Sequence, residues 1–199
     1  MDISWTDAIL SSGVGVGLAA ATGFRVFIPL LTLGVAARLE WLPLSDGFSW
    51  LASVPAIAAF SIATMVEIAA YYTPIIDNFL DFVAGPLAIV AGVLTTAAVT
   101  TDMPPVLRWS IAIVAGGGTA GLVQGVTSIV RLKSTVFTGG VGNFLVATLE
   151  LLGSIAASLM AILLPAIAIV GVAFLLIVFI LTRKRGSAAG SGLEPHQRL

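Results

Sequence analysis

Three ionisable residues lie inside long apolar segments of this chain, and they are the side chains best suited to chemistry. Arg25 is the only charged residue from Ala8 to Ala37, and Glu67 and Glu150 lie in two later apolar segments. Burying a charge in a bilayer costs about 2.5–3.5 kcal/mol even on the most lenient insertion scale, so such residues usually mark a substrate or ion pathway. Buried carboxylates can also couple a proton or a cation to the movement of a solute.

Polar side chains at helical spacing accompany these charges. A stripe on the fourth apolar segment combines glycines with Gln124 and Arg131. If these stripes face one another, they line a polar cavity between helices, and we predict that this cavity binds a small solute or ion. The polar neighbours are Thr64 and Tyr71 on the face of Glu67, and Asn143 and Ser154 on the face of Glu150. The predicted substrate-binding residues are Arg25, Glu67, Gln124, Arg131, Asn143 and Glu150.

The same charges also have a structural interpretation, which the sequence leaves open. Glu67 or Glu150 can form a buried interhelical ion pair with Arg131. Arg25 can attract an anion at a helix break, or its long side chain can tie the break together. The charges therefore either line a cavity or only stabilise the helix bundle.

The composition indicates the elements that must position these side chains. The chain has 199 residues, of which 58% are hydrophobic and only 10% charged, whereas a soluble domain has about 25% charged residues. Its apolar runs of about twenty residues are long enough to cross a bilayer as helices. We therefore predict an all-α polytopic transmembrane helix bundle in the lipid bilayer. The absence of cysteine excludes disulfides and thiolate chemistry, and a net charge of −1 argues against a nucleic-acid partner.

About six spans are expected, in a single transmembrane domain over residues 1–182. The first apolar segment is too long for one upright helix, so we expect a broken or re-entrant helix with Gly23 and Pro29 as break points. If Pro165 does not divide the last two segments, they form one long bent helix, and the number of membrane spans is five. The segments are Thr6–Ala37, Trp50–Tyr72, Phe79–Val99, Val106–Val130 and two within Asn143–Leu181.

The distribution of lysine and arginine predicts the orientation. With six spans, Arg38 and Arg108 lie on one side, and the N-terminus lies on the other side with five basic residues. This bias places both termini in the cytoplasm and the protein in a bacterial inner membrane. The five residues are Arg131, Lys133, Arg183, Lys184 and Arg185. Residues 183–199 are expected to be a short basic sequence that ends the last span, followed by a flexible polar tail. No functional role is predicted for this tail or for His196 within it.

Glycines and loop residues predict local packing. Gly117, Gly121 and Gly125 repeat at four-residue spacing, which favours close helix packing and, as an alternative, a homo-oligomer contact. In "TGGVGN" (138–143) we expect glycines at positive φ and Asn143 as the N-cap of the next helix. Asp77 is expected as the N-cap of the third segment's helix, with Asp81 near its first turn. A weak similarity between residues 72–83 and 137–148 suggests that two helix pairs are repeats.

Three stretches together resemble one known family. "GLAAATGFRVFIPLL" (17–31), the stretch from Glu67 to Asp81, and "STVFTGGVGN" followed by Glu150 are similar to the domain-of-unknown-function 4126 family of small bacterial membrane proteins. The resemblance covers most of residues 10–165. It implies that the family's recurrent positions are Arg25, Glu67, Asp77, Gly139, Gly140, Gly142 and Glu150.

The resemblance implies an architecture but no activity. Family members often have more polar residues on the fourth segment and a second acid beside the position of Glu150. This chain has Gln124 and Leu151 at or near those places, which implies that its solute specificity differs from that of its relatives.

The function predicted from the residues is a small-solute or ion transporter or channel. The alternative is a non-transporting membrane scaffold or a subunit of a larger membrane assembly. No serine–histidine pair, metal-ligand set or aspartyl pair has catalytic spacing in this sequence. We therefore expect no enzymatic activity, no metal site and no cofactor.

Overall fold

The computed structural model describes residues 5–72, 74–101, 103–164 and 174, without the side chains of Trp5 and residues 74–82. The predicted sixth segment after Pro165 and the polar tail lie outside the described residues. Every described secondary-structure element is a helix, which confirms the all-α prediction. The elements are α1 (Trp5–Thr22), α2 (Phe27–Arg38), the 3-10 helix η1 (Ser49–Ala52), α3 (Val54–Tyr71), α4 (Pro74–Val99), α5 (Pro105–Ile111), the π-helical turn η2 (Ala112–Gly117), α6 (Gly118–Thr138) and α7 (Asn143–Leu163).

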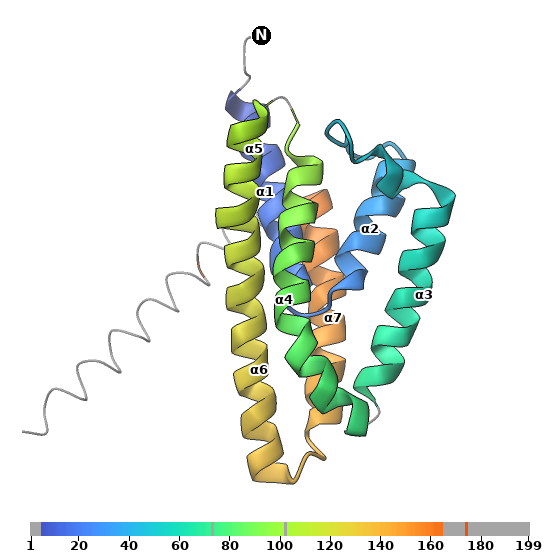
Figure 1. The fold of residues 1–199 in the computed structure, drawn as a ribbon, viewed down its shortest axis with the longest axis vertical. Helices are drawn as coiled ribbons and strands as arrows, with labels where there is room; N and C mark the ends of the chain where they lie inside the picture. The colour runs from blue at the N-terminus through green and yellow to red at the C-terminus, as the bar shows by residue number, and fades with distance from the viewer. Residues whose placement is uncertain (1–4, 73, 102, 165–173, 175–199) are drawn as a thin grey trace, which may run out of the picture.

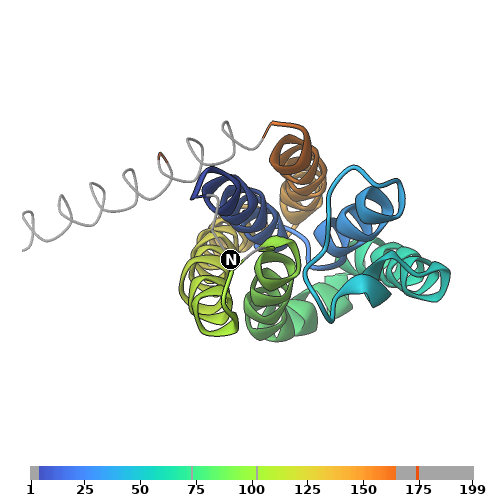
Figure 2. The same ribbon diagram turned by 90° about the horizontal axis from the view of Figure 1, so that it is seen from above.

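Three of the described helical segments are long and apolar enough to cross a membrane. They are α3, the continuous helix from Pro105 to Thr138 formed by α5, η2 and α6, and α7. Helix α4 runs antiparallel to α1, α3 and α6 and is 26 residues long, with Pro86 inside it. In the view from above (Figure 2), α1 and α4 lie near the centre, α6 and α7 flank them, and α3 lies outermost beside α2. These features support a helix bundle in a membrane.

The first apolar segment is a re-entrant helical hairpin. Figure 1 shows α1 descending from the N-terminal end of the bundle, a turn at mid-height, and α2 returning to the same end. Gly23 in the turn lies against Ala120 and Val123. Ala120 is about 22 Å along its helix from Pro105 and about 27 Å from Thr138, at 1.5 Å per residue. The turn therefore lies near the middle of the bundle's length.

This hairpin contradicts the predicted placement of Arg38 and Arg108 on the side opposite the N-terminus. Because α2 returns to the end where the chain begins, Arg38 and Arg108 lie at the N-terminal end of the bundle, whereas the loop with Gly139 lies at the opposite end. The sequence argument placed Arg38 and the N-terminus on opposite sides, because it counted the first segment as one span. Helix α7 also ends at the N-terminal end (Figure 1). The cytoplasmic location of both termini stays a prediction.

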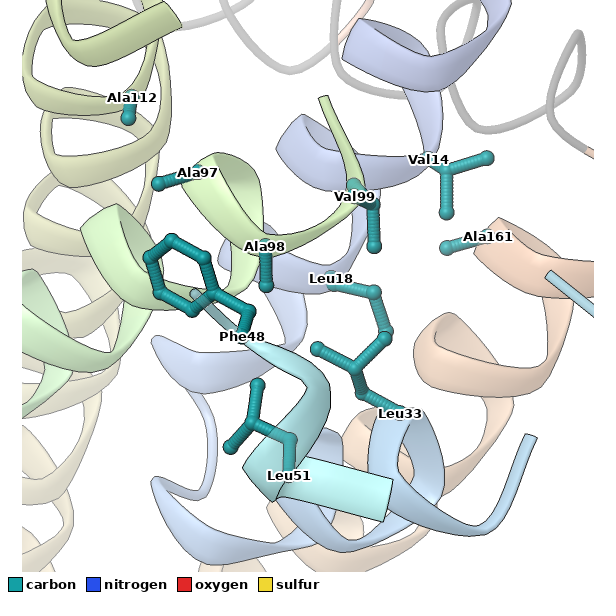
Figure 3. Packing of buried hydrophobic residues seen from close by; sticks show 10 residues of the cluster. All are labelled: Val14, Leu18, Leu33, Phe48, Leu51, Ala97, Ala98, Val99, Ala112 and Ala161. Atoms are coloured by element: carbon teal, nitrogen blue, oxygen red, sulfur yellow. The ribbon is translucent and has the colours of Figure 1, made fainter. Parts of the chain in front are cut away.

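An apolar core holds the hairpin against the rest of the bundle. Figure 3 shows side chains from α1, α2, the segment before α3, α4, η2 and α7 meeting between the helices. The core residues are Val14, Leu18, Leu33, Phe48, Leu51, Ala97, Ala98, Val99, Ala112 and Ala161. They fill the half of the bundle that contains α1 and α2. The other half, beyond the turn, is enclosed by α3, α4, α6 and α7 (Figure 1).

Two of the three spaced glycines pack inside the chain. A Cβ atom at Gly117 would lie 2.9 Å from Val93 Cγ2, and one at Gly121 would lie 3.2 Å from Ile89 Cγ1, both on α4. Gly125 has no neighbour within 4 Å of such a Cβ. The predicted close packing of helices therefore accounts for Gly117 and Gly121, and the homo-oligomer contact stays a prediction.

Two predicted helix starts were wrong by a few residues. Helix α4 begins at Pro74, so Asp77 lies inside it rather than at its N-cap. Gly142 occupies the N-cap of α7, and Asn143 is the first helical residue. The positive φ angles predicted in this loop are confirmed at Gly139 (62°) and Gly140 (91°), where α6 ends in a left-handed cap.

Candidate functional site

Four ionisable side chains and one tyrosine gather beyond the re-entrant turn, from four separate parts of the chain. We call this group the buried charge cluster. None of its members exposes more than 7% of its surface. Arg131 and Glu150 each lie about 10 Å along their helices from the α6–α7 turn, at 1.5 Å per residue. The members are Arg25 after α1, Glu67 and Tyr71 on α3, Arg131 on α6, and Glu150 on α7.

Glu67 caps the N-terminus of α2 from another helix. Its Oε1 accepts a hydrogen bond from Val26 N (2.8 Å), and its Oε2 accepts one from Phe27 N (3.1 Å). The first N–H groups of a helix have no partner within the helix. Val26 is the N-cap residue and has no side-chain oxygen with which to supply one. The carboxylate of Glu67 satisfies these donors and lies at the positive end of the helix dipole.

Arg131 and Glu150 form a bidentate ion pair. Arg131 Nε donates to Glu150 Oε1 (2.9 Å), and Arg131 Nη2 donates to Glu150 Oε2. Paired hydrogen bonds between guanidinium and carboxylate are both charge-assisted and directional. The interhelical pair predicted as an alternative to a cavity therefore exists for Glu150, whereas the described partners of Glu67 are backbone N–H groups.

Arg25 is held by a carbonyl, an aromatic ring and a carboxylate. Its Nη2 donates to Ala147 O (2.9 Å) and lies 3.8 Å from Glu150 Oε2. Its Cζ lies 3.7 Å from the centroid of the Tyr71 ring, and Arg131 Cζ lies 4.2 Å from the same centroid. Arg25 Nε and Nη1 are buried without a hydrogen-bond partner. Arg25 therefore retains hydrogen-bonding capacity inside the bundle.

Hydroxyl side chains of α6 and α7 contact carbonyl groups at the end of α1, and a hydroxyl of α1 contacts a carbonyl of α4. Ser154 Oγ donates to Ala21 O (3.1 Å), and Thr127 Oγ1 approaches Gly23 O at 3.5 Å. Thr22 Oγ1 also reaches across to Ala88 O on α4 (3.2 Å). Irregular backbone at membrane depth is tolerated only where protein or water satisfies its polar groups. These contacts explain how a turn can lie in the middle of the bundle.

The structure brings together four of the six predicted site residues. Arg25, Glu67, Arg131 and Glu150 belong to the buried charge cluster. Gln124 is buried, but its described hydrogen bond is to Ser128 Oγ of the same helix (3.4 Å). The side chain of Asn143 donates to Thr135 Oγ1 (2.9 Å), near the α6–α7 turn.

Sequence reasoning placed Tyr71 on the face of Glu67 but missed its contact with two guanidinium groups. It also missed the backbone N–H groups of Val26 and Phe27 and the carbonyl of Ala147. Backbone partners carry no residue-type signal, so spacing alone could not have found them. The only available signal was the helix break itself, which exposes backbone donors at the start of α2.

A known protein family matches most of this sequence. A family model described as "Domain of unknown function (DUF4126)" matches residues 13–185. No curated protein and no solved structure matches the chain. The family match covers every member of the buried charge cluster.

Proposed function

We propose that this protein, which belongs to the DUF4126 family, is a membrane transporter or channel that moves a small solute or ion. The observation that carries the proposal is the re-entrant turn at mid-height, beside which Arg25, Glu67, Arg131 and Glu150 meet inside the bundle. Many transporters build their binding sites from broken helices near the bilayer midplane, where half-helix ends face the solute. We place the protein in the inner membrane of a bacterium.

The contacts of the buried charge cluster fit a closed state of the protein, in which each carboxylate binds donors that a solute could replace. Each carboxylate already has donors: Glu67 has the N-terminus of α2, and Glu150 has Arg131. A solute that enters the cluster would replace one of these partners. Because these contacts join the start of α2 to α3 and join α6 to α7, such a replacement would change how these elements are held together.

The test uses purified full-length protein in liposomes. Shrinkage and swelling after osmotic shock are followed by light scattering with potassium chloride, sodium acetate, urea and glycerol as solutes. We expect protein-dependent flux of at least one solute, and we expect Glu67→Gln and Glu150→Gln to reduce that flux at least tenfold. Glu40→Gln, a change at an exposed glutamate, is the matched control and should leave the flux unchanged.

Two results would refute this proposal. One is the absence of protein-dependent flux for every solute tested. The other is undiminished flux in both glutamine variants when size-exclusion profiles show that they are folded. In the second case the carboxylates would have no part in the mechanism.

A scaffold is the second candidate, and the Arg131–Glu150 ion pair favours it. The pair is buried, and each oxygen of Glu150 accepts a hydrogen bond from Arg131, as expected of a purely structural contact. A scaffold would lose stability or partner binding, and not flux, when Glu150 is replaced. The liposome test therefore separates the two candidates.

A further inference from the structure

We infer that a solute reaches the buried charge cluster between α3 and α7, through an entrance that Tyr72 closes in this structure. The use of this entrance for transport rests on the proposed function. The entrance itself does not, because access to the cluster is a property of the fold that can be measured without transport. The inference gives Tyr72 the role of controlling access to the site.

Two layers of contacts separate the cluster from the outside at this place. In the inner layer, Arg25 lies over the ring of Tyr71 and donates to Ala147 O. The next residues along the two helices, Tyr72 and Thr148, contact each other in the outer layer. The inner pair, Tyr71 and Ala147, is buried. The outer pair is partly exposed. The interior of the bundle therefore ends within one residue on each helix.

The outer layer consists of Tyr72, Phe144 and Thr148, and we call it the outer closure. Tyr72 Oη and Thr148 Oγ1 are hydrogen-bonded at 3.0 Å, and the ring centroids of Tyr72 and Phe144 are 4.8 Å apart. Thr148 Oγ1 also donates to Phe144 O (2.9 Å), so it keeps a partner when Tyr72 moves away. Because both hydroxyl residues are partly exposed, water can replace the hydrogen bond between them. Opening the outer closure therefore costs one neutral hydrogen bond and one ring contact.

The other boundaries of the cluster that have described contacts are held more strongly. Helices α6 and α7 are joined by their turn and by the buried Arg131–Glu150 pair. Helices α2 and α3 are joined by Glu67, whose two carboxylate oxygens accept backbone N–H groups of α2. Helix α6 packs closely on α4 at Gly117 and Gly121. Opening one of the first two boundaries leaves a buried charge without its partner, which costs far more than separating two hydroxyls.

The outer closure is therefore the place where the cluster opens at the lowest cost. Proteins open locally with free energies that range from near zero to the full stability, and segments that admit ligands come from the low end of this range. Tyr72 is also the C-cap of α3, so its movement breaks no turn in the middle of a helix. Removing its side chain should make the open form more common.

The experiment measures how fast a single buried cysteine reacts with 2-sulfonatoethyl methanethiosulfonate in the full-length protein in detergent. The chain has no cysteine of its own. Ala147→Cys reports on the cluster, and Ala161→Cys, at an equally buried alanine of the same helix in the apolar core, reports on global unfolding. We expect Tyr72→Ala to raise the reaction rate of Ala147→Cys about tenfold or more, since a hydrogen bond and an aromatic contact are lost. The rate of Ala161→Cys should stay unchanged.

Two further variants separate the ring from the hydroxyl, and the entrance from its surroundings. Tyr72→Phe keeps the ring contact and loses the hydrogen bond, so it should raise the rate less than Tyr72→Ala. Phe137→Ala removes an exposed aromatic side chain at the same end of the bundle but outside the outer closure, and it should leave the rate unchanged. If Ala147→Cys does not fold, Ser154→Cys takes its place, because Ser154 is a buried residue about two turns further along α7.

The outcomes separate this inference from the proposed transport. An unchanged reaction rate in a folded Tyr72→Ala variant overturns the entrance, even if liposome flux is present. Equal acceleration of Ala147→Cys and Ala161→Cys overturns it as well, because the whole bundle has then loosened. The same holds if Phe137→Ala accelerates the reaction as much as Tyr72→Ala. A selective acceleration by Tyr72→Ala, in a protein without flux, upholds the entrance and removes only transport.

Discussion

Tyr71 and Glu150 allow two arginines to lie close together inside an apolar bundle. Both guanidinium carbons are within 4.2 Å of the Tyr71 ring centroid, and one oxygen of Glu150 faces Nη2 of each arginine. Each cation–π contact contributes about 0.5–2 kcal/mol, with the larger value when the pair is desolvated. At the residue scale, the cluster is a set of mutually dependent contacts.

This dependence predicts how the Arg131–Glu150 pair responds to substitution. Arg131→Gln should lower the free energy of unfolding by about 3–5 kcal/mol, because it leaves Glu150 without its main counter-ion. The double variant Arg131→Gln/Glu150→Gln should recover part of this loss, because no carboxylate then remains there. The measurement is thermal or denaturant unfolding in detergent, with Arg38→Gln as the surface control. Strictly additive effects of the two single changes would contradict the prediction.

At the scale of elements, the re-entrant hairpin depends on a close approach at its turn. A Cβ atom at Gly23 would lie 2.5 Å from Val123 Cβ and 2.8 Å from Ala120 O. One of these neighbours is backbone in the centre of a long helix, so it cannot move aside at low cost. The π-helical turn on the same long helix fits α4 equally closely, since a Cβ at Gly116 would lie 2.6 Å from Gly92 O.

We therefore expect opposite effects from two glycine-to-alanine changes. Gly23→Ala should destabilise the protein by about 1–3 kcal/mol through overpacking. Gly125→Ala, with no neighbour within 4 Å, should be neutral or stabilise α6 by up to about 1 kcal/mol through helix propensity. Unfolding temperatures of the two variants in the same detergent test this. Equal effects would mean that the turn is not packed against α6 as described.

For the whole molecule, the hairpin decides which loops share a side of the membrane. The exposed tryptophans Trp41, Trp50 and Trp109 belong to segments at the N-terminal end of the bundle, whereas Phe137 and Phe144 flank the α6–α7 turn at the other end. Tryptophan is enriched at membrane interfaces, because its ring is apolar and its N–H group is polar. The three tryptophans therefore indicate where one bilayer surface lies along the bundle, whereas the phenylalanines give no such indication.

Cysteine labelling tests this topology directly, because the chain has no cysteine of its own. Single exposed replacements Asp7→Cys, Asp46→Cys and Val141→Cys are treated in intact cells with a membrane-impermeant maleimide. We expect Asp7→Cys and Asp46→Cys to behave alike, and Val141→Cys to behave in the opposite way. Opposite labelling of the first two positions would mean that the segment from Thr6 to Ala37 crosses the membrane once.

The sequence by itself determined the fold class, the helix break near Gly23 and which charged residues lie in the apolar segments. These features follow from local composition, since apolar runs of sufficient length must form helices in a bilayer and charges are rare there. Only the tertiary structure decided that α2 returns beside α1, that Glu67 binds backbone N–H groups while Glu150 binds Arg131, and that Gln124 and Asn143 make other contacts. The physical reason is that partner choice depends on which backbone donors and helix faces meet across the bundle, and residue types do not encode those distances.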